Sequence, residues 1–375
     1  MRNVLVIPHV PTYKVKVREK EIARHLAQRY NCFYLSWAES YRYTLVSRIL
    51  VLLKDLIKKT KIKKEGKLKI VEFPVLHRPL GLASRFNRIQ LDRFCVKNDI
   101  DVVLNSNCFL FSVPDDKKYK YIYDFVDLPA EDFKSKFGKF IYNHTRKETE
   151  KADLVIACSS GLIDFIRTEF QREALLIPNG TDLADYRNVK KPQIEKIRQK
   201  YGLGQRFVIG CIGNFGPWMN LKFLIKVFKK LKNVMKDAVL FLVGPGKDFV
   251  YYSKKIKDPD IIFTGAVSFK DIHPCFAAMD IAVLPNEKSY FQDLAFHIKL
   301  IEYTAAKKIT VSANLREAVR INFPNIIIVP HEVDKWIEAV EKARSMKWQE
   351  SWDYLVDEYD WSKICTELSN SIEQL

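Results

Sequence analysis

The sequence predicts an α/β protein built from two doubly wound units. Short apolar runs alternate with longer amphipathic stretches, which is the pattern of parallel strands joined by helices. This alternation fills the first half of the chain and restarts near residue 207. A chain of 375 residues is also longer than one ordinary domain. These observations favour two domains of the same architecture.

The expected elements follow one another in a regular order. Strands of the first half are predicted at 3–8, 32–36, 69–74, 102–105, 121–125, 154–157 and 174–177, with helices at 18–29, 83–97 and 140–151. Strands of the second half are predicted at 207–213, 238–243, 261–264, 281–285, 309–312 and 326–329, with helices at 221–232, 272–279, 297–306 and 334–346. The polar segment 182–196 has no clear apolar period and predicts a linker.

Charge and cysteine content exclude several classes of protein. Residues 1–120 hold 25 Lys and Arg against 11 Asp and Glu, whereas the rest of the chain is nearly balanced at 37 against 34. A basic end indicates a polyanionic partner. No nucleic acid-binding signature accompanies it, so nucleic acid is not expected. The seven cysteines form no metal-binding pattern, which favours reduced thiols and a cytoplasmic location.

Glycines end two strands of the second half. Gly213 and Gly244 stand where an open parallel sheet binds its ligands, beyond the carboxyl ends of the strands. A glycine there lets backbone N–H groups approach a phosphate, or it simply makes a tight turn. Further along, Lys299 and Glu302 share one face of the helix predicted over 297–306. They are either ligand-binding groups or a surface ion pair.

The order of these segments resembles the GT-B glycosyltransferases, especially family 4 and its branch of teichuronic-acid and xanthan-assembly glucuronosyltransferases. The resemblance is carried by 207–232, 241–246, 263–286, 297–313 and 359–368. It implies two Rossmann-like domains facing a central cleft. Residues 1–182 would bind the acceptor and residues 183–357 the nucleotide-sugar donor. The terminal helix within 358–375 would pack back on the first domain.

The resemblance also implies a donor site. HIKLIEYTAA resembles the K-L-x-E-Y element of sugar-nucleotide transferases, in which the glutamate, here Glu302, binds the ribose and the lysine, here Lys299, contacts the diphosphate. The other donor-binding candidates are Gly213, Asn214, Gly244, Val267, His297 and Ile298. The donor would be a substrate, with a UDP-sugar favoured over a GDP-sugar, and neither a cofactor nor a metal is expected.

Several positions depart from the family pattern. Leu294 stands where many family 4 enzymes have an acid, with Asp293 one position away. Asn214 and Met219 replace the usual phosphate-binding cations, and Lys307 replaces a glycine. These departures keep two alternatives open. One is a catalytically degenerate GT-B protein with a nucleotide-binding or scaffold role, and the other is a nucleotide-sugar epimerase.

The candidate proton acceptors lie in the first half. YIYDFVDLPAED resembles the Y-D-x-x-D element of the same branch, which makes Asp127 the first candidate base and Asp124 the second. Either aspartate could instead cap a helix beginning near residue 129. His9 follows the first predicted strand and should share this edge of the sheet.

A basic, apolar segment covers residues 41–64. Its leucines and isoleucines recur at helical spacing among Lys and Arg, which predicts an amphipathic helix on an anionic membrane. The alternative is a core helix with a basic end. With the resemblance, this segment favours transfer of a sugar to a glycan or polyprenyl-linked acceptor in surface polysaccharide or glycoconjugate assembly, at the cytoplasmic face of the membrane.

Overall fold

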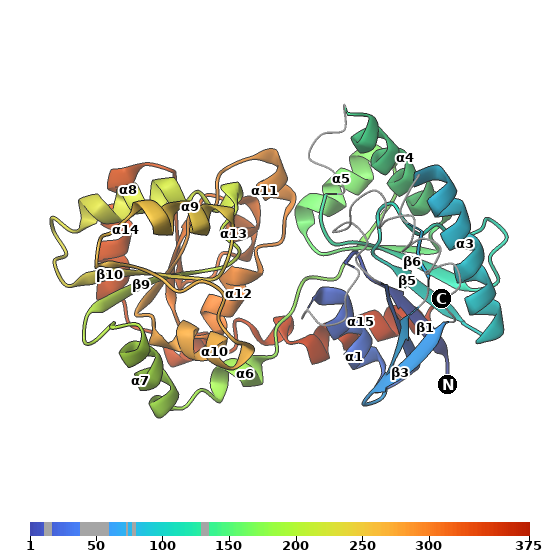
Figure 1. Cartoon of the computed structure of the whole chain (residues 1–375), viewed down its shortest axis with the longest axis horizontal. Helices are drawn as coiled ribbons and strands as arrows, with labels where there is room; N and C mark the ends of the chain where they lie inside the picture. Colours follow the sequence, from blue (N-terminus) through green and yellow to red (C-terminus); the bar gives the residue numbers. More distant parts are fainter. Residues whose placement is uncertain (11–16, 38–59, 73, 77–79, 129–134) are drawn as a thin grey trace. The chain divides into compact units, whose positions relative to one another are not determined.

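The computed structural model describes residues 1–10, 17–37, 60–72, 74–76, 80–128 and 135–375. The chain divides into two compact units. The first contains Met1–Asn179 and Trp361–Leu375, and the second contains Gly180–Asp360. Each unit is a parallel sheet covered by helices on both faces (Figure 1). The prediction of two doubly wound α/β units is therefore confirmed.

The first unit is a mostly parallel sheet with the strand order β3-β4-β2-β1-β5-β6-β7-β8, in which only β3 pairs antiparallel. Its strands are β1 (Asn3–Ile7), β2 (Asn31–Ser36), β3 (Lys61–Glu65), β4 (Leu68–Glu72), β5 (Val102–Asn105), β6 (Lys120–Phe125), β7 (Leu154–Ala157) and β8 (Leu175–Leu176). Its helices are α1 (Arg18–Leu26), α3 (Leu80–Lys97), α4 (Lys136–Lys151), α5 (Ser160–Phe170) and α15 (Trp361–Glu373).

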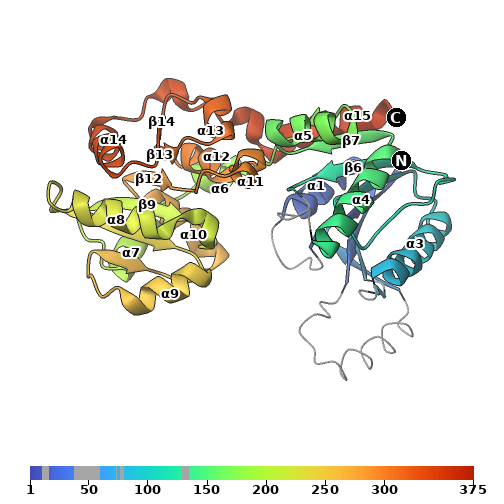
Figure 2. The same cartoon turned by 90° about the horizontal axis from the view of Figure 1, so that it is seen from above.

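Alternate residues of the central strands face opposite sides of this sheet, as the pleat requires. Val4 and Val6 of β1 belong to a buried cluster with α1 and α15, which lie side by side (Figures 1 and 2). The opposite face is covered by α3, α4 and α5, and Phe33 of β2 meets Phe94 of α3 at 5.7 Å between ring centroids. The last helix of the chain thus completes the core of the first unit, and Leu368 within it is fully buried.

The second unit has the strand order β11-β10-β9-β12-β13-β14, and every pairing in it is parallel. Its strands are β9 (Phe207–Ile212), β10 (Ala238–Val243), β11 (Ile261–Phe263), β12 (Ile281–Leu284), β13 (Ile309–Ala313) and β14 (Ile326–Val329). Its helices are α6 (Leu183–Arg187), α7 (Lys191–Lys200), α8 (Leu221–Leu231), α9 (Lys247–Lys255), α10 (Phe269–Ala278), α11 (Tyr290–Leu294), α12 (Ile298–Ala305), α13 (Arg316–Ile321) and α14 (Val333–Ser345).

The prediction of an irregular linker over 182–196 is wrong. This segment forms α6 and the first part of α7, and both helices belong to the second unit. Ile194, Ile197 and Tyr201 recur at helical spacing and pack against the core beside α10. Three apolar residues therefore fix a helix whose remaining surface is polar.

The helix predicted over 41–64 is wrong where the structure describes it. Residues 41–59 lie outside the described residues, and Lys61–Glu65 form the edge strand β3. Lys63 of this strand forms an ion pair of 2.8 Å with Glu72 of β4, its neighbour in the sheet. Charged, fully exposed residues are suited to a sheet edge because they discourage pairing with another chain.

Candidate functional site

A buried ion pair fixes the carboxyl-terminal edge of the first sheet. Arg18, at the start of α1, donates from Nε and Nη2 to the two carboxylate oxygens of Asp124, each at 3.1 Å. The hydroxyl of Ser106 donates to the same carboxylate at 3.0 Å. Arg18 also donates to the carbonyl of Pro178 and to the side chain of Asn179, where the chain leaves the unit. Both members of the pair are almost fully buried.

These contacts disfavour Asp124 as a proton acceptor. Its two oxygens already accept hydrogen bonds from Arg18 and Ser106, so protonating it would break a buried ion pair. Its role in the structure is to hold β6, the start of α1 and the loop after β5 together. Sequence reasoning missed Arg18 because it lies 106 residues from Asp124 in the chain.

Asp127 and His9 lie at the same edge. Asp127 follows β6 and reaches solvent from a densely packed part of this edge. Desolvation by the surrounding protein raises the pKa of Asp127 to about 6, the charge of His9 opposes this rise, and the charge of Glu19 adds to it. A carboxylate with a pKa near neutrality is a better proton acceptor than an ordinary aspartate. The N-cap alternative for Asp127 concerns residues 129–134, which lie outside the described residues.

Glu19 orients His9. One carboxylate oxygen of Glu19 forms an ion pair with Nδ1 of His9 and accepts the backbone N–H of His9 at 3.0 Å. The other oxygen is buried with no hydrogen-bond partner in the part of the chain that the structure describes. Burial alone would lower the pKa of His9, but the hydrogen bond and charge of Glu19, with the charges of Asp127 and Asp124, raise it above its ordinary value.

In the second unit, backbone packing requires a glycine at Gly244 but not at Gly213. The loops after β9 and β10 touch, so a Cβ on Gly244 would lie 2.0 Å from the carbonyl oxygen of Gly213. Gly244 also has a φ of +128°, which other residues rarely adopt. A Cβ added to Gly213 would meet only the side chain of Met219, whose terminal methyl group would lie 3.3 Å away. Of the two interpretations of Gly244, the tight turn is the one that these contacts support.

Lys299 and Glu302 come together on α12. They form an ion pair along one face of the helix, and Lys299 also lies over the ring of Phe276, 5.6 Å from its centroid. Glu302 accepts a second hydrogen bond from the hydroxyl of Tyr186, and the proximity of this carboxylate contributes to a raised Tyr186 pKa that burial dominates. Tyr186 belongs to the segment first interpreted as a linker, which is why the sequence did not indicate this contact.

The next residue anchors α12 to the sheet. The hydroxyl of Tyr303 accepts the backbone N–H of Ile212 at 2.9 Å, one residue before Gly213. The face that carries Lys299 and Glu302 is thereby held near the end of β9, and the charge of Lys299 acts on Cys211 in that strand. The second unit thus holds α12, with its Lys299–Glu302 ion pair, against the strand that ends at Gly213.

The remaining candidates divide into packing residues and accessible ones. His297 is buried and its Nε2 bonds to the carbonyl of Gln292 at 2.9 Å, while burial lowers its pKa, so the ring is a neutral structural group. Val267 packs against the core. Ile298 is half-buried and Asn214 is exposed.

Asp293 accepts the backbone N–H of Arg316 and pairs with Lys288, which makes it a structural acid.

One buried group was not foreseen. Asn286 follows β12, and its side-chain nitrogen donates to Gln292 at 2.7 Å. Its side-chain oxygen is buried and has no hydrogen-bond partner within the described residues. A buried acceptor at a strand end is available to a ligand hydroxyl. A single Asn after an apolar run gives no signal for this in the sequence.

Comparisons with known proteins show what the second unit and the whole chain resemble. Residues 206–345 match the family described as glycosyl transferases group 1. The chain is 24% identical over 248 residues to the glycosyltransferase TuaH of Bacillus subtilis, whose name assigns it to teichuronic acid biosynthesis. That match covers 62% of this chain and 60% of TuaH.

Solved structures match over the full length. HepE from Anabaena, in complex with UDP, has a TM-score of 0.69 at 16% identity and covers 100% of both chains. A glycosyltransferase from Rickettsia africae has a TM-score of 0.72 at 16% identity, over 99% of this chain and 97% of its own. Sucrose-phosphate synthase from Thermosynechococcus elongatus has a TM-score of 0.75 at 12% identity, over 100% and 99%.

The electrostatics of His9 can be tested directly by NMR. In a Glu19→Gln variant, the burial that lowers the His9 pKa remains and the main charge that raises it is removed. We expect the pKa from the ring resonances to be above 6.5 in the wild type and to fall in the variant. An unchanged His9 pKa would show that Glu19 does not control this ring.

The pKa shifts of His9 and Glu19 also determine how the stability of the fold changes with pH. A raised His9 pKa stabilises the fold below its unfolded value of about 6.5, and this contribution is lost as the pH rises through the folded value. The lowered Glu19 pKa gives a contribution that is lost as the pH falls below about 4.5. The melting-temperature advantage of the wild type over Glu19→Gln should therefore shrink on raising the pH above neutrality.

Residues 206–345 thus match the glycosyl transferases group 1 family, and the whole chain has the GT-B fold of these solved structures.

Proposed function

We propose that this protein transfers a sugar from a nucleotide-sugar, with a UDP-sugar as the favoured donor, to a glycan or lipid-linked acceptor in surface polysaccharide or glycoconjugate assembly. The observation that carries the proposal is that Gly213, Lys299 and Glu302 all fall within the matched family domain. HepE, a protein of the same fold, has been solved with UDP and with UDP-glucose. The biosynthetic setting follows the name of TuaH.

In the proposed donor complex, the nucleotide separates Lys299 from Glu302. Ribose hydroxyls donate to the Glu302 carboxylate, which keeps its hydrogen bond from Tyr186. The Lys299 ammonium binds the diphosphate and stabilises its charge as the bond to the sugar breaks. Lys299 takes this role alone among side chains of the first glycine loop and α12, because Asn214 and Met219 carry no charge.

The acceptor hydroxyl would lose its proton to Asp127, which has the raised pKa of a suitable base. His9 lies in the electrostatic range of Asp127 and modulates its pKa. We further propose that the acceptor is polyprenyl-linked and that residues 41–64 contact the anionic cytoplasmic face of the membrane. Most of that segment lies outside the described residues. Among the described helices, none combines the length and apolar character needed to cross a bilayer.

Calorimetric titration with UDP, GDP, ADP and CMP tests the donor site. We expect UDP to bind most tightly, and Lys299→Gln and Glu302→Gln each to weaken it by about 10- to 100-fold, since each removes hydrogen bonds to a charged group. Lys335→Gln is a matched control, because Lys335 and Glu338 form another i,i+3 ion pair on α14. Equal affinities in all four proteins would place the nucleotide elsewhere.

The role of Asp127 is tested with a donor and acceptor pair that supports release of UDP. The wild-type kcat should rise with pH through about 6, as Asp127 loses its proton. Asp127→Asn should lower kcat by about 10²- to 10⁴-fold with unchanged UDP affinity. A kcat within threefold of the wild type, on the order of experimental error for such an effect, would remove Asp127 as the base.

The alternative is a degenerate GT-B protein that binds a nucleotide without turnover. The uncharged residues at Asn214 and Met219 favour it. UDP binding that depends on Lys299 and Glu302, with no turnover of any UDP-hexose, would establish this alternative.

A further inference from the structure

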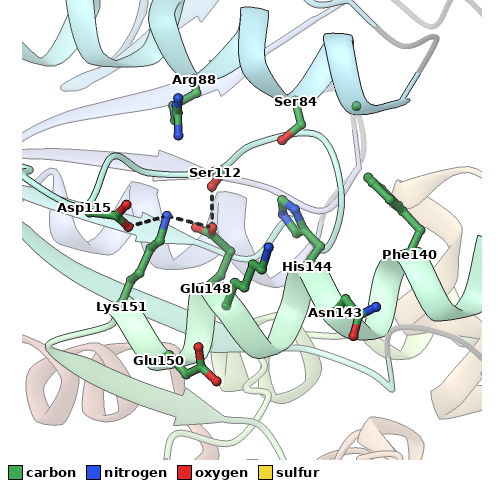
Figure 3. Close-up of a pocket in the computed structure, with 12 residues that line it drawn as sticks. Ser84, Arg88, Ser112, Asp115, Phe140, Asn143, His144, Glu148, Glu150 and Lys151 are labelled. Carbon is green, nitrogen blue, oxygen red and sulfur yellow. Dashed lines mark hydrogen bonds and ion pairs between the residues drawn. The ribbon is translucent and has the colours of Figure 1, made fainter.

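A cavity of about 660 Å³ lies between α3 and α4 of the first unit, within the size range of ligand sites. Ser84 and Arg88 enter it from α3, and Ser112 enters from the loop after β5 (Figure 3). His144 and Lys151 line it from α4. Asp124, Asp127 and His9, at the carboxyl-terminal edge of the sheet, do not line this cavity.

The acids of this cavity are already paired. Glu148 is buried and accepts hydrogen bonds from the Ser112 hydroxyl, the Tyr121 hydroxyl and the backbone N–H of Val113. Asp115 pairs with Lys151 at 2.9 Å. Glu150 pairs with Arg146 at 3.4 Å. Lys151 also lies 4.0 Å from Glu148, so this one lysine faces two acids of the lining.

Two cations of the same cavity remain unpaired. Arg88 and Lys147 have no hydrogen bond or ion pair with any other residue in the described part of the chain. Arg85 lines an adjoining recess with Ser84, and it too has no hydrogen bond or ion pair with any other residue that the structure describes. The hydrogen bond and charge of Lys151, with the charge of Arg88, hold the pKa of Asp115 below its usual value, which reflects a positive local potential. Arg85, Arg88 and Lys147 are therefore available to an anionic ligand.

Phosphate fits these groups better than a carboxylate. The planar guanidinium of Arg88 can make two parallel hydrogen bonds to phosphate oxygens, and Lys147 adds a point charge. Ser84 lies four residues before Arg88, on the same face of α3, with its hydroxyl unpaired among the described residues. Together these groups supply hydrogen-bond donors to the oxygens of a tetrahedral anion.

An exposed apolar stripe runs along α3 beside the cavity. Leu82, Ile89 and Val96 are seven residues apart and are 63%, 43% and 61% exposed. Residues spaced by seven share one helix face. Arg85 and Arg93 border that face at helical spacing. Exposed apolar residues flanked by arginines are typical of a helix that lies on an anionic membrane.

We propose that the cavity between α3 and α4 binds a phosphate ester, and that this ester is the headgroup of an anionic lipid in the membrane on which the α3 stripe rests. This site is separate from the proposed donor site in the second unit and does not depend on sugar transfer.

The test uses the full-length protein with two probes. Flotation with phosphatidylcholine vesicles, with and without phosphatidylglycerol, measures binding to the lipid, and calorimetry with glycerol 3-phosphate measures binding of the free ester. The test variant is Arg88→Gln with Lys147→Gln. The control is Lys97→Gln with Lys139→Gln, which removes two exposed charges from the same helices outside the cavity.

We expect the wild-type protein to bind only those vesicles that contain phosphatidylglycerol. The loss of affinity for both probes should be at least about tenfold greater in the test variant than in the control. Ile89→Ser should weaken vesicle binding and leave glycerol 3-phosphate binding unchanged. Binding of glycerol 3-phosphate without vesicle binding would support the phosphate site and overturn the lipid source. Equal losses in the two double variants, or binding of neither probe, would overturn the site.

UDP binding to each variant keeps this test separate from the proposed function. All three variants should bind UDP as the wild type does, which also shows that they are folded. Loss of lipid binding with intact UDP binding concerns the cavity alone.

Discussion

The buried ion pair between Arg18 and Asp124 organises the polar edge of the first unit. Leaving either charge without its partner in this environment would cost about 3–5 kcal/mol. Arg18 precedes Glu19 in the chain, and Asp124 stands three residues before Asp127. The pair therefore sets the positions of the groups that surround His9. Its further hydrogen bonds to Pro178 and Asn179 connect that edge to the point where the chain leaves the unit.

In the second unit, the corresponding contact is a hydrogen bond between neutral groups rather than an ion pair. The hydroxyl of Tyr303 accepts from Ile212 and joins α12 to the end of β9. The loop after β9 is in turn packed against Gly244 so closely that no side chain fits there. A rigid glycine turn and the helix that carries Lys299 and Glu302 are thus held together without a ligand. Such preorganisation lowers the entropy cost of binding a charged group.

Much of the fold could be predicted because strands that are buried on both faces appear as continuous apolar runs. The elements that were missed lack this signal. β3 is made of exposed Lys and Glu with a single Ile, Ile62, and α7 is polar apart from Pro192, Ile194 and Ile197. For the site, the topology rule placed Asp127, His9 and Gly213 at strand ends. The partners Arg18 and Tyr186 could not be foreseen, because Arg18 lies 106 residues from Asp124 and Tyr186 belongs to a segment taken for a linker.

The central claim is that the second unit binds a nucleoside diphosphate at the loop after β9 and at α12. Hydrogen–deuterium exchange of the wild-type protein, with and without UDP, tests it most directly. The account predicts that UDP slows exchange in residues 213–216 and 298–302 and leaves α14 unchanged. Protection confined to the first unit, or no protection at saturating UDP, would contradict it.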